Sequence, residues 1–106
     1  MPTRLTLDTA HRDNGKFALV AAGEIDLSNI DTFTQALNTA ITEAGSSGGT
    51  LTVDLSAVDY LDSAAINALF AHAEQIHLIA RPLLMRVFTI SGLAELATIE
   101  SVPPEH

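Results

Sequence analysis

Apolar and polar side chains alternate at the start of the chain, which is the pattern of a β-strand. The alternation covers residues 3–8 and has the period of two that a half-buried strand requires. The apolar run over residues 17–22 predicts a second strand, which we expect Gly23 to end. Between the two runs, Asn14 and Gly15 favour a tight turn because both residue types tolerate positive φ. The chain is therefore predicted to open with a β-hairpin.

The first of three segments with helical spacing covers residues 29–44, where apolar residues recur on one face of an amphipathic helix. Just before it, Ser28 and Asp31 are placed almost as in a capping box. The acidic stretch over residues 23–28 predicts a loop or a short strand. Residues 45–49 are Gly and Ser only and end the helix. This stretch leads into a strand and lacks the Lys of a phosphate-binding loop, so it predicts a flexible connection.

The second half of the chain alternates strand and helix patterns. Residues 50–55 form the strongest strand pattern, and a helix with one buried face follows them. That face consists of Ile66, Leu69, Phe70 and Ala73. Residues 76–80 predict a short strand, after which Pro82 suits the first turn of a third helix and Gly92 suits its C-cap. Residues 96–102 predict a last strand or a segment that packs back on the core.

This order of elements predicts an α/β fold, because strands that alternate with helices need crossover connections over a sheet. The length of 106 residues suits a single domain over residues 1–106. Apolar residues make up 47% of the chain, which is enough to build a core. We expect the ordered core to cover about residues 3–102, followed by a short tail that contains Pro103 and Pro104.

The charge balance narrows the range of partners. Five Lys and Arg residues stand against thirteen Asp and Glu residues, so the formal net charge is -8. This balance argues against non-specific nucleic-acid binding and against docking on an anionic membrane, since both depend on cationic side chains. The chain has no cysteine, which excludes a disulfide scaffold, a cysteine zinc site and a thiol nucleophile. It also lacks a signal-peptide core and a run of about 20 apolar residues, so we expect a cytoplasmic protein without membrane insertion.

No catalytic or metal site emerges from the pattern of reactive residues. The histidines show no three-ligand spacing; they are His11, His72, His77 and His106. Ser63 lies outside a Gly-x-Ser-x-Gly elbow and has no evident histidine base. The acid pairs Glu24/Asp26 and Asp59/Asp62 could serve glycoside hydrolysis, a magnesium site or a phosphoryl-aspartate site. However, the chain has no Trp to line a sugar cleft, and it has a single Lys, Lys16, where a phosphoryl-aspartate site would need one near the end of a strand. We therefore expect neither an enzyme nor a cofactor, and interpret these acids as solvated loop residues.

Ser63 or Asp62 is expected at or just beside the N-cap of the second helix, where a hydroxyl would lie at the surface. A phosphate on Ser63 would meet free N–H groups and the positive end of the helix dipole. It would add a charge of about -1.5 to -2 beside Asp62 and near Asp59. Such a change could break a protein interface without unfolding the domain.

Residues 51–66, Leu-Thr-Val-Asp-Leu-Ser-Ala-Val-Asp-Tyr-Leu-Asp-Ser-Ala-Ala-Ile, resemble the signature of the STAS family, in particular bacterial anti-sigma factor antagonists. That signature is a hydrophobic strand ending in Asp-Leu-Ser, an apolar pair, and then Asp-Ser-Ser/Thr/Ala-Gly-Leu. Upstream, Gly-Glu-Ile-Asp over residues 23–26 resembles the family's Gly-Glu-Leu-Asp. Downstream, Ile-Ser-Gly-Leu over residues 90–93 resembles its Thr/Ser-Gly-Leu. The three matches occur in the expected order.

The resemblance implies a single STAS domain with a mixed β-sheet and a partner-switching role. In that family the unmodified antagonist binds an anti-sigma factor, usually a serine kinase of the histidine-kinase-like ATPase fold, and so frees a sigma factor. The kinase then phosphorylates the antagonist, and a PP2C-type phosphatase reverses the reaction. ATP belongs to the kinase, so no cofactor is implied for this chain.

Carried over by position, the resemblance makes Ser63 the phosphorylation site, with Asp62 as its neighbour and Asp26 as the acid of the nearby loop. The implied partner-binding residues are Glu24, Asp26, Asp59, Asp62, Ser63, Ala64 and Ala65. The acids among them are expected to surround Ser63 and to meet a basic patch on the partner.

Two departures from the family pattern support an alternative. Ala65 stands where the family usually has Gly, and its methyl group is expected to limit how closely a partner approaches. The Gly-Gly turn before residues 76–80 is missing, which leaves open whether that strand is short, displaced or absent. The alternative is a STAS interaction module that is not phosphorylated, as a subunit of a transporter or signalling complex. Ser63 would then be only an N-cap.

Overall fold

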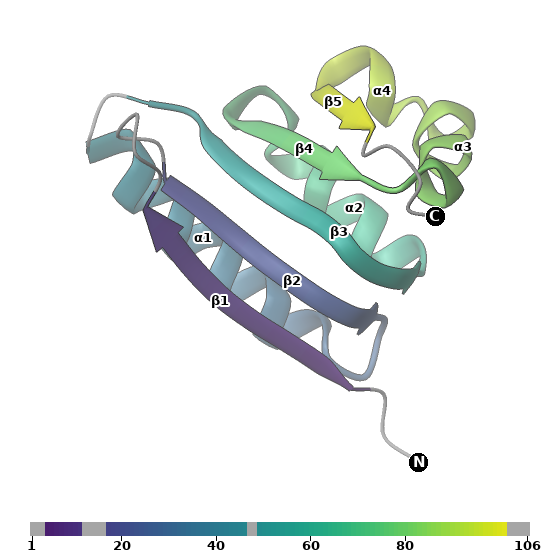
Figure 1. Cartoon of the computed structure of the whole chain (residues 1–106), viewed down its shortest axis with the longest axis horizontal. Helices are drawn as coiled ribbons and strands as arrows, with labels where there is room; N and C mark the ends of the chain where they lie inside the picture. Colours follow the sequence, from purple (N-terminus) through teal and green to yellow (C-terminus); the bar gives the residue numbers. More distant parts are fainter. Residues whose placement is uncertain (1–3, 12–16, 47–48, 102–106) are drawn as a thin grey trace, which may run out of the picture.

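Five strands lie side by side in one sheet, in the order in which they occur along the chain (Figure 1). The computed structural model describes residues 4–11, 17–46 and 49–101. The elements are β1 (Leu5–His11), β2 (Phe17–Ile25), α1 (Ile30–Ser46), β3 (Leu51–Leu61), α2 (Ser63–Ala71), the 3-10 turn η1 (Ala73–Gln75), β4 (Ile76–Ala80), α3 (Pro82–Ser91), α4 (Leu93–Leu96) and β5 (Thr98–Ser101). β1 pairs with β2 antiparallel, and all other neighbours pair parallel. The predicted α/β fold with a mixed sheet is confirmed.

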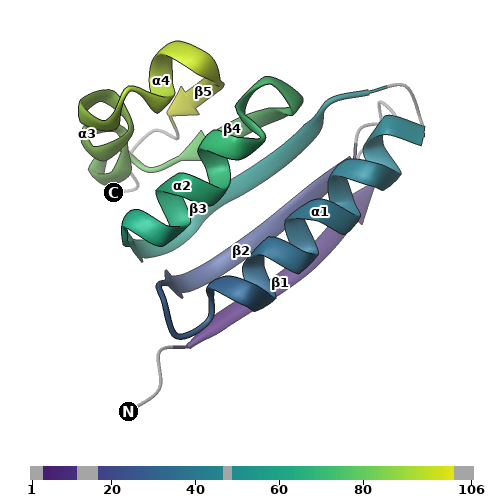
Figure 2. The ribbon, with the colours of Figure 1, turned by 180° about the vertical axis from the view of Figure 1, so that it is seen from behind.

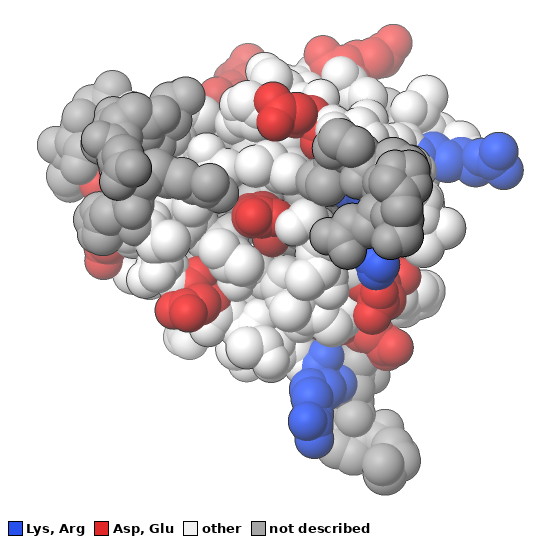
Figure 3. All heavy atoms as spheres, in the orientation of Figure 1, with Lys and Arg blue, Asp and Glu red and all other residues white. Residues whose placement is uncertain are grey.

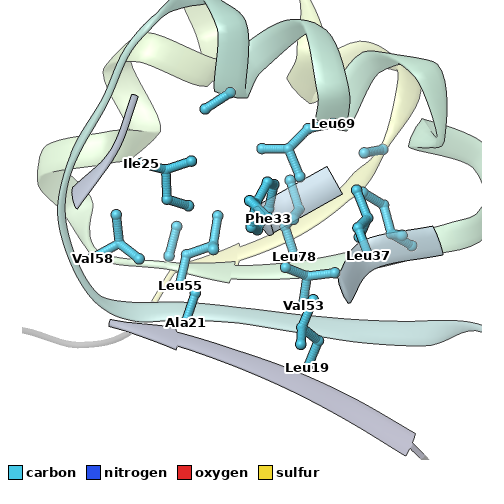
Figure 4. Close-up of a cluster of buried hydrophobic side chains, with 14 of the residues drawn as sticks. Leu19, Ala21, Ile25, Phe33, Leu37, Val53, Leu55, Val58, Leu69 and Leu78 are labelled. Carbon is cyan, nitrogen blue, oxygen red and sulfur yellow. The ribbon is translucent and has the colours of Figure 1, made fainter. Parts of the chain in front are cut away.

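Helices α1 and α2 cover one face of the sheet, as the view from behind shows (Figure 2). β4 alternates buried and half-buried residues, as the period of two requires, whereas β2 and β3 each begin with three consecutive buried residues. Phe33 and Leu37 of α1 pack with Leu69 of α2 over the strand residues Val53 and Leu78 (Figure 4). All five side chains are fully buried, and each contributes about 1.5–3 kcal/mol relative to an exposed position.

The predicted hairpin of β1 and β2 is confirmed, but the prediction that Gly23 ends the second strand is wrong. β2 continues through Gly23 to Ile25. Gly23 has φ +102°, and a Cβ atom on it would lie 2.3 Å from the carbonyl oxygen of Arg4. The glycine therefore permits the close approach of the two strands rather than terminating one of them. The predicted turn at Asn14 and Gly15 lies outside the described residues.

β3 is also longer than predicted, because it continues from Leu55 to Leu61 beside β2. Its pairing with β2 contains register shifts after Val20 and after Gly23, and such irregularities bend and twist a strand pair. The extension brings Glu24 and Ile25 next to the end of β3. The ends of β2 and β3 thereby position the candidate site.

The C-terminal half resolves the alternatives left open for residues 76–80. They form β4, a short strand of five residues that lies between β3 and β5. Helix α3 begins with Pro82 in its first turn and ends at Gly92, whose φ of +88° suits a C-cap, as predicted. The four-residue helix α4 was not predicted, since a single turn is too short to show a period. Among the described residues, every helix is too short or too polar to cross a bilayer.

Candidate functional site

Helix α2 begins at the edge of the sheet where the parallel strands β2 and β3 end (Figure 1). Asp62 has an extended backbone and occupies the N-cap, so Ser63 is the first helical residue. The Asp62 Oδ1 atom accepts hydrogen bonds from the N–H groups of Ala64 at 3.0 Å and Ala65 at 3.2 Å. These are two of the donors that a helix leaves without an intrahelical partner. Of the two residues expected at or beside the N-cap, Asp62 therefore occupies it, and the assignment of Ser63 as the N-cap is wrong.

Asp62 also links α2 to the loop between β2 and α1. Its Oδ2 atom accepts the N–H group of Leu27 at 2.9 Å, across 35 positions of sequence. Its own N–H group donates to the carbonyl oxygen of Ile25 at 3.1 Å. The carboxylate thus joins the loop to the helix start, and the backbone N–H group of the same residue joins both to the end of β2. Hydrogen bonds to a charged acceptor are about twice as strong as neutral ones.

The loop itself is closed by hydrogen bonds among its own residues. Asp26 Oδ1 accepts the N–H group of Ser28 at 2.9 Å and its hydroxyl at 2.5 Å. Asn29 Oδ1 accepts the N–H group of Asp26 at 3.0 Å, and Asn29 Nδ2 donates to the carbonyl oxygen of Glu24 at 2.9 Å. Helix α1 begins only at Ile30. The Ser28 hydroxyl donates to Asp26 instead of capping α1, so the capping-box prediction is wrong.

The Ser63 side chain is exposed, and among the described residues its hydroxyl makes no hydrogen bond. Free N–H groups were expected at the start of this helix, but those of Ala64 and Ala65 both donate to Asp62. The next N–H group, that of Ile66, donates to the carbonyl oxygen of Asp62 at 3.1 Å. Ser63 therefore presents an accessible hydroxyl beside an anionic carboxylate that already accepts the N–H groups of the two following residues.

The four acids predicted around Ser63 have different surroundings. Asp62 caps α2, and Asp26 lies in the loop bonded to Asp62 through Leu27. Glu24 is exposed on β2 beside Tyr60 of β3. Asp59 forms a salt bridge with Arg81, the residue before α3. Arg81 offsets the charge of Asp59, so the local negative charge is smaller than the sequence suggests.

Ala64 and Ala65 also differ in their exposure. Ala64 is half-buried, whereas Ala65 is completely buried and belongs to the core. Ala65 was placed among the partner-binding residues, but its side chain offers no surface to a partner. The methyl group that replaces the family's Gly points into the core, so it does not limit the approach of a partner.

The described residues contain no group of three or more metal-binding side chains. The His72 ring lies 3.4 Å from Gln75 Oε1, and His77 Nε2 lies 4.0 Å from Glu100 Oε1. The His11 side chain and His106 lie outside the described residues.

In chemical terms, the group that this site exposes is the nucleophilic hydroxyl of Ser63.

A family model described as "Mlab, STAS domain" matches residues 9–99 of the chain. The chain belongs to the STAS domain family. A search of curated protein sequences finds no match for this STAS domain.

Among solved structures, this STAS domain is similar to an anti-sigma factor antagonist from Mycobacterium paratuberculosis, with 24% identity, a TM-score of 0.81, and coverage of 93% of this chain and 87% of the other. It is also similar to the anti-sigma factor antagonist SpoIIAA in its unphosphorylated form, with 15% identity, a TM-score of 0.67, and coverage of 91% and 89%. The Bacillus cell fate determinant SpoIIAA in the phosphorylated form shares 15% identity, with a TM-score of 0.62 and coverage of 91% and 92%. At these identities the likeness shows a shared fold.

The sequence patterns missed three residues near the site of this STAS domain. Leu27 bonds to Asp62 and exposes 76% of its surface, and Tyr60 exposes 50%. Both were available as apolar residues that interrupt acidic stretches. The third residue is Arg81, which could have been noticed as a cation directly after the predicted strand of residues 76–80. Since carboxyl ends of parallel strands share one edge, it could have been placed near the end of β3.

Proposed function

We propose that this STAS domain is an anti-sigma factor antagonist whose binding is switched by phosphorylation of Ser63. In this proposal it binds an anti-sigma factor that is a serine kinase of the histidine-kinase-like ATPase fold. It thereby frees a sigma factor, and it acts in the cytoplasm by binding rather than by catalysis. The kinase phosphorylates Ser63 and is released, and a PP2C-type phosphatase restores the binding form.

The observation that carries the proposal is the exposed Ser63 hydroxyl at the start of α2, with no hydrogen bond among the described residues. A kinase can reach this hydroxyl without breaking an internal contact. The proposal gains support from the similar folds described as anti-sigma factor antagonists, one of them in a phosphorylated form.

The surroundings of Ser63 support a switch that acts through surface charge. A phosphate would add a charge of about -1.5 to -2 next to the Asp62 carboxylate, which already uses the N–H groups of Ala64 and Ala65. The added charge would therefore stay at the surface, without hydrogen bonds from these two N–H groups. A partner that fits the unmodified surface around Leu27 and Ser63 would meet a new, unpaired charge.

The test is phosphorylation by the kinase that co-purifies with the chain. The wild-type chain is incubated with this kinase and ATP, and the phosphorylated residue is located by mass spectrometry. Ser63→Ala should abolish the modification, whereas Ser28→Ala is the matched control, because Ser28 is also an exposed serine at the site. Ser63→Asp should weaken kinase binding. Equal phosphate uptake by wild type and Ser63→Ala would refute the proposal.

A second candidate function is a STAS interaction module that is not phosphorylated, as a subunit of a transporter or signalling complex. The observation that favours it is the Asp62 carboxylate, which occupies two N–H groups that a phosphate would otherwise bind. In this case a complex isolated with the chain contains no kinase, and Ser63→Asp binds the partner as tightly as wild type.

A further inference from the structure

β1 is a long edge strand whose outer side is open in the described part of the chain. It is the outermost strand in both ribbon views (Figures 1 and 2). Its seven residues pair with β2 in one unbroken register, without a bulge or a proline. Edge strands are usually short, bulged, interrupted by proline or covered, because their unpaired backbone groups invite another strand. β5, at the other edge, has only four residues.

The pairing with β2 determines which backbone groups of β1 point outward. The N–H group of Glu24 donates to the carbonyl oxygen of Arg4 at 3.1 Å, so this pair is a hydrogen-bonded one. Because hydrogen-bonded and non-hydrogen-bonded pairs alternate in an antiparallel ladder, Leu5, Leu7 and Thr9 direct their backbone groups away from β2. The Thr9 N–H group already donates to Asp8 Oδ1 at 2.9 Å. Leu5 and Leu7 therefore offer the outward donors for a further strand.

We propose that a second copy of this chain adds to β1 as an antiparallel strand, about a two-fold axis through Thr6. In this register Leu5 of each copy faces Leu7 of the other, and the outward backbone groups of both form hydrogen-bonded pairs. Arg4 of each copy faces Asp8 of the other. The cation of each copy thus faces the anion of the other, and opposite charges in directly facing positions stabilise strand pairing.

Other registers fit less well. An axis through Leu7 would require the Thr9 N–H group, which is bonded to Asp8. An axis through Asp8 would also use Thr9 and would place the two Asp8 side chains opposite each other, which is destabilising. The axis through Thr6 is the register that uses only the donors of Leu5 and Leu7 and pairs each anion with a cation.

The two faces of β1 suit this arrangement. Arg4, Thr6 and Asp8 are exposed, whereas Leu5 and Leu7 are half-buried and pack against the core. Beside Leu7, a groove of about 600 Å³ separates β1 from α1. Its apolar side includes Phe17, Leu19 and Ala36. The leucines of a second copy would lie on this face of the joined sheet and cover the open end of the groove.

The proposal does not depend on the function of Ser63. Helix α2 follows β3, which is separated from β1 by β2. The start of α2 therefore stays exposed in both copies of the dimer.

Sedimentation velocity of the full chain over a concentration series tests the proposal. The wild-type chain is expected to dimerise with a dissociation constant in the micromolar range, as small interfaces do. Arg4→Asp and Asp8→Arg should each weaken association by at least about tenfold, since each creates two like-charge pairs across the axis. The double variant Arg4→Asp/Asp8→Arg exchanges the charges and should restore association. Arg4 and Asp8 are exposed, so these substitutions do not change the packing of the core.

Arg86→Asp and Glu95→Arg are the matched controls, because they make the same changes in net charge at exposed positions on α3 and α4. Both should dimerise like wild type. A monomeric wild-type chain at about 1 mM would overturn the proposal. So would equal association of all variants, or a double variant that stays as weak as the single ones.

A cysteine cross-link tests the register independently, because the chain contains no other cysteine. At a non-hydrogen-bonded pair on the axis, the two Cα atoms lie about 4.5 Å apart, which suits a disulfide. Thr6→Cys should therefore form a covalent dimer under mild oxidation. Ala10→Cys is the control, since its two copies would lie about 27 Å apart. Equal cross-linking of the two variants, or none in Thr6→Cys, would contradict the register.

Discussion

Replacing Asp62 can separate the two roles of its carboxylate. Oδ1 caps α2 through the N–H groups of Ala64 and Ala65, and Oδ2 holds the loop through the N–H group of Leu27. Asp62→Ala removes both roles. Asp62→Asn keeps an oxygen that can cap the helix but places an amide donor where Leu27 needs an acceptor. The difference between the two variants therefore measures the cap, and the Asn variant measures the link to the loop.

The magnitudes follow from the contacts. Loss of an N-cap costs about 1 kcal/mol, and loss of a hydrogen bond to a charged acceptor costs about 1.5 kcal/mol. Asp62→Ala should thus lower the free energy of unfolding by about 2–3 kcal/mol, and Asp62→Asn by about 1–1.5 kcal/mol. With a urea m-value of about 1.5 kcal/mol/M, the midpoint shifts are about 1.5–2 M and about 1 M.

Urea unfolding followed by circular dichroism gives the midpoints, and amide hydrogen exchange assigns the loss to each contact. Leu27 should exchange faster in both variants, whereas Ala64 and Ala65 should exchange faster only in Asp62→Ala. Ser63→Ala is the control and should stay within about 0.5 kcal/mol of wild type, as exposed positions usually do. An Asp62→Ala chain as stable as this control, or an unchanged Leu27 amide in Asp62→Asn, would refute the assignment.

Other substitutions test the fold around the site. Gly23→Ala should destabilise the chain by at least about 2 kcal/mol in urea unfolding, because a Cβ atom there meets the backbone of β1 at positive φ. Gly45→Ala is its control: a Cβ atom there has open space, so the helix should gain about 0.5–1 kcal/mol. Phe33→Ala should cost about 3–5 kcal/mol, since Phe33 is fully buried, and an unfolding midpoint close to wild type would contradict its place in the core. Asp59→Ala should cost less than about 1 kcal/mol, because its salt bridge with Arg81 is at the surface, and a cost unchanged in high salt would contradict an ion pair.

The elements that could be predicted from the sequence are those whose signals are local. The alternation in β1, the strand pattern of residues 76–80 and the helix that starts at Pro82 and has Gly92 as its C-cap depend on neighbouring residues. The structure confirms each of them. Gly23 could not be interpreted in this way. Its positive φ accommodates the Arg4 carbonyl oxygen, and that contact depends on the pairing of β1 with β2. A glycine with such a contact has the same local signal as one that ends a strand.

The candidate site shows the same limit. Asp62 and Ser63 are both good N-cap residues, so local preference could not choose between them. In the structure the Asp62 side chain caps α2 and also accepts the N–H group of Leu27, which lies 35 positions away in sequence. A contact at this distance leaves no local signal. Likewise, the burial of Ala65 depends on how α2 is rotated against the sheet, and the pairing of Asp59 with Arg81 depends on the position of β4 next to β3.

The position of the cap also bears on how a modification of Ser63 would act. In a serine at the N-cap, phosphorylation would modify the oxygen that accepts the capping hydrogen bond, so the contacts at the helix start would change. Here Asp62 provides the cap and Ser63 stands one position later, so the hydroxyl can be modified while the helix start stays intact. The N–H groups of Ala64 and Ala65 bond to Asp62 and are therefore not available to a phosphate. Because the same two bonds cap α2, the helix does not need Ser63 for its start. A switch built in this way would alter the charge of the surface and leave the fold unchanged, which predicts that wild type and Ser63→Asp unfold within about 0.5 kcal/mol of each other while differing in partner affinity.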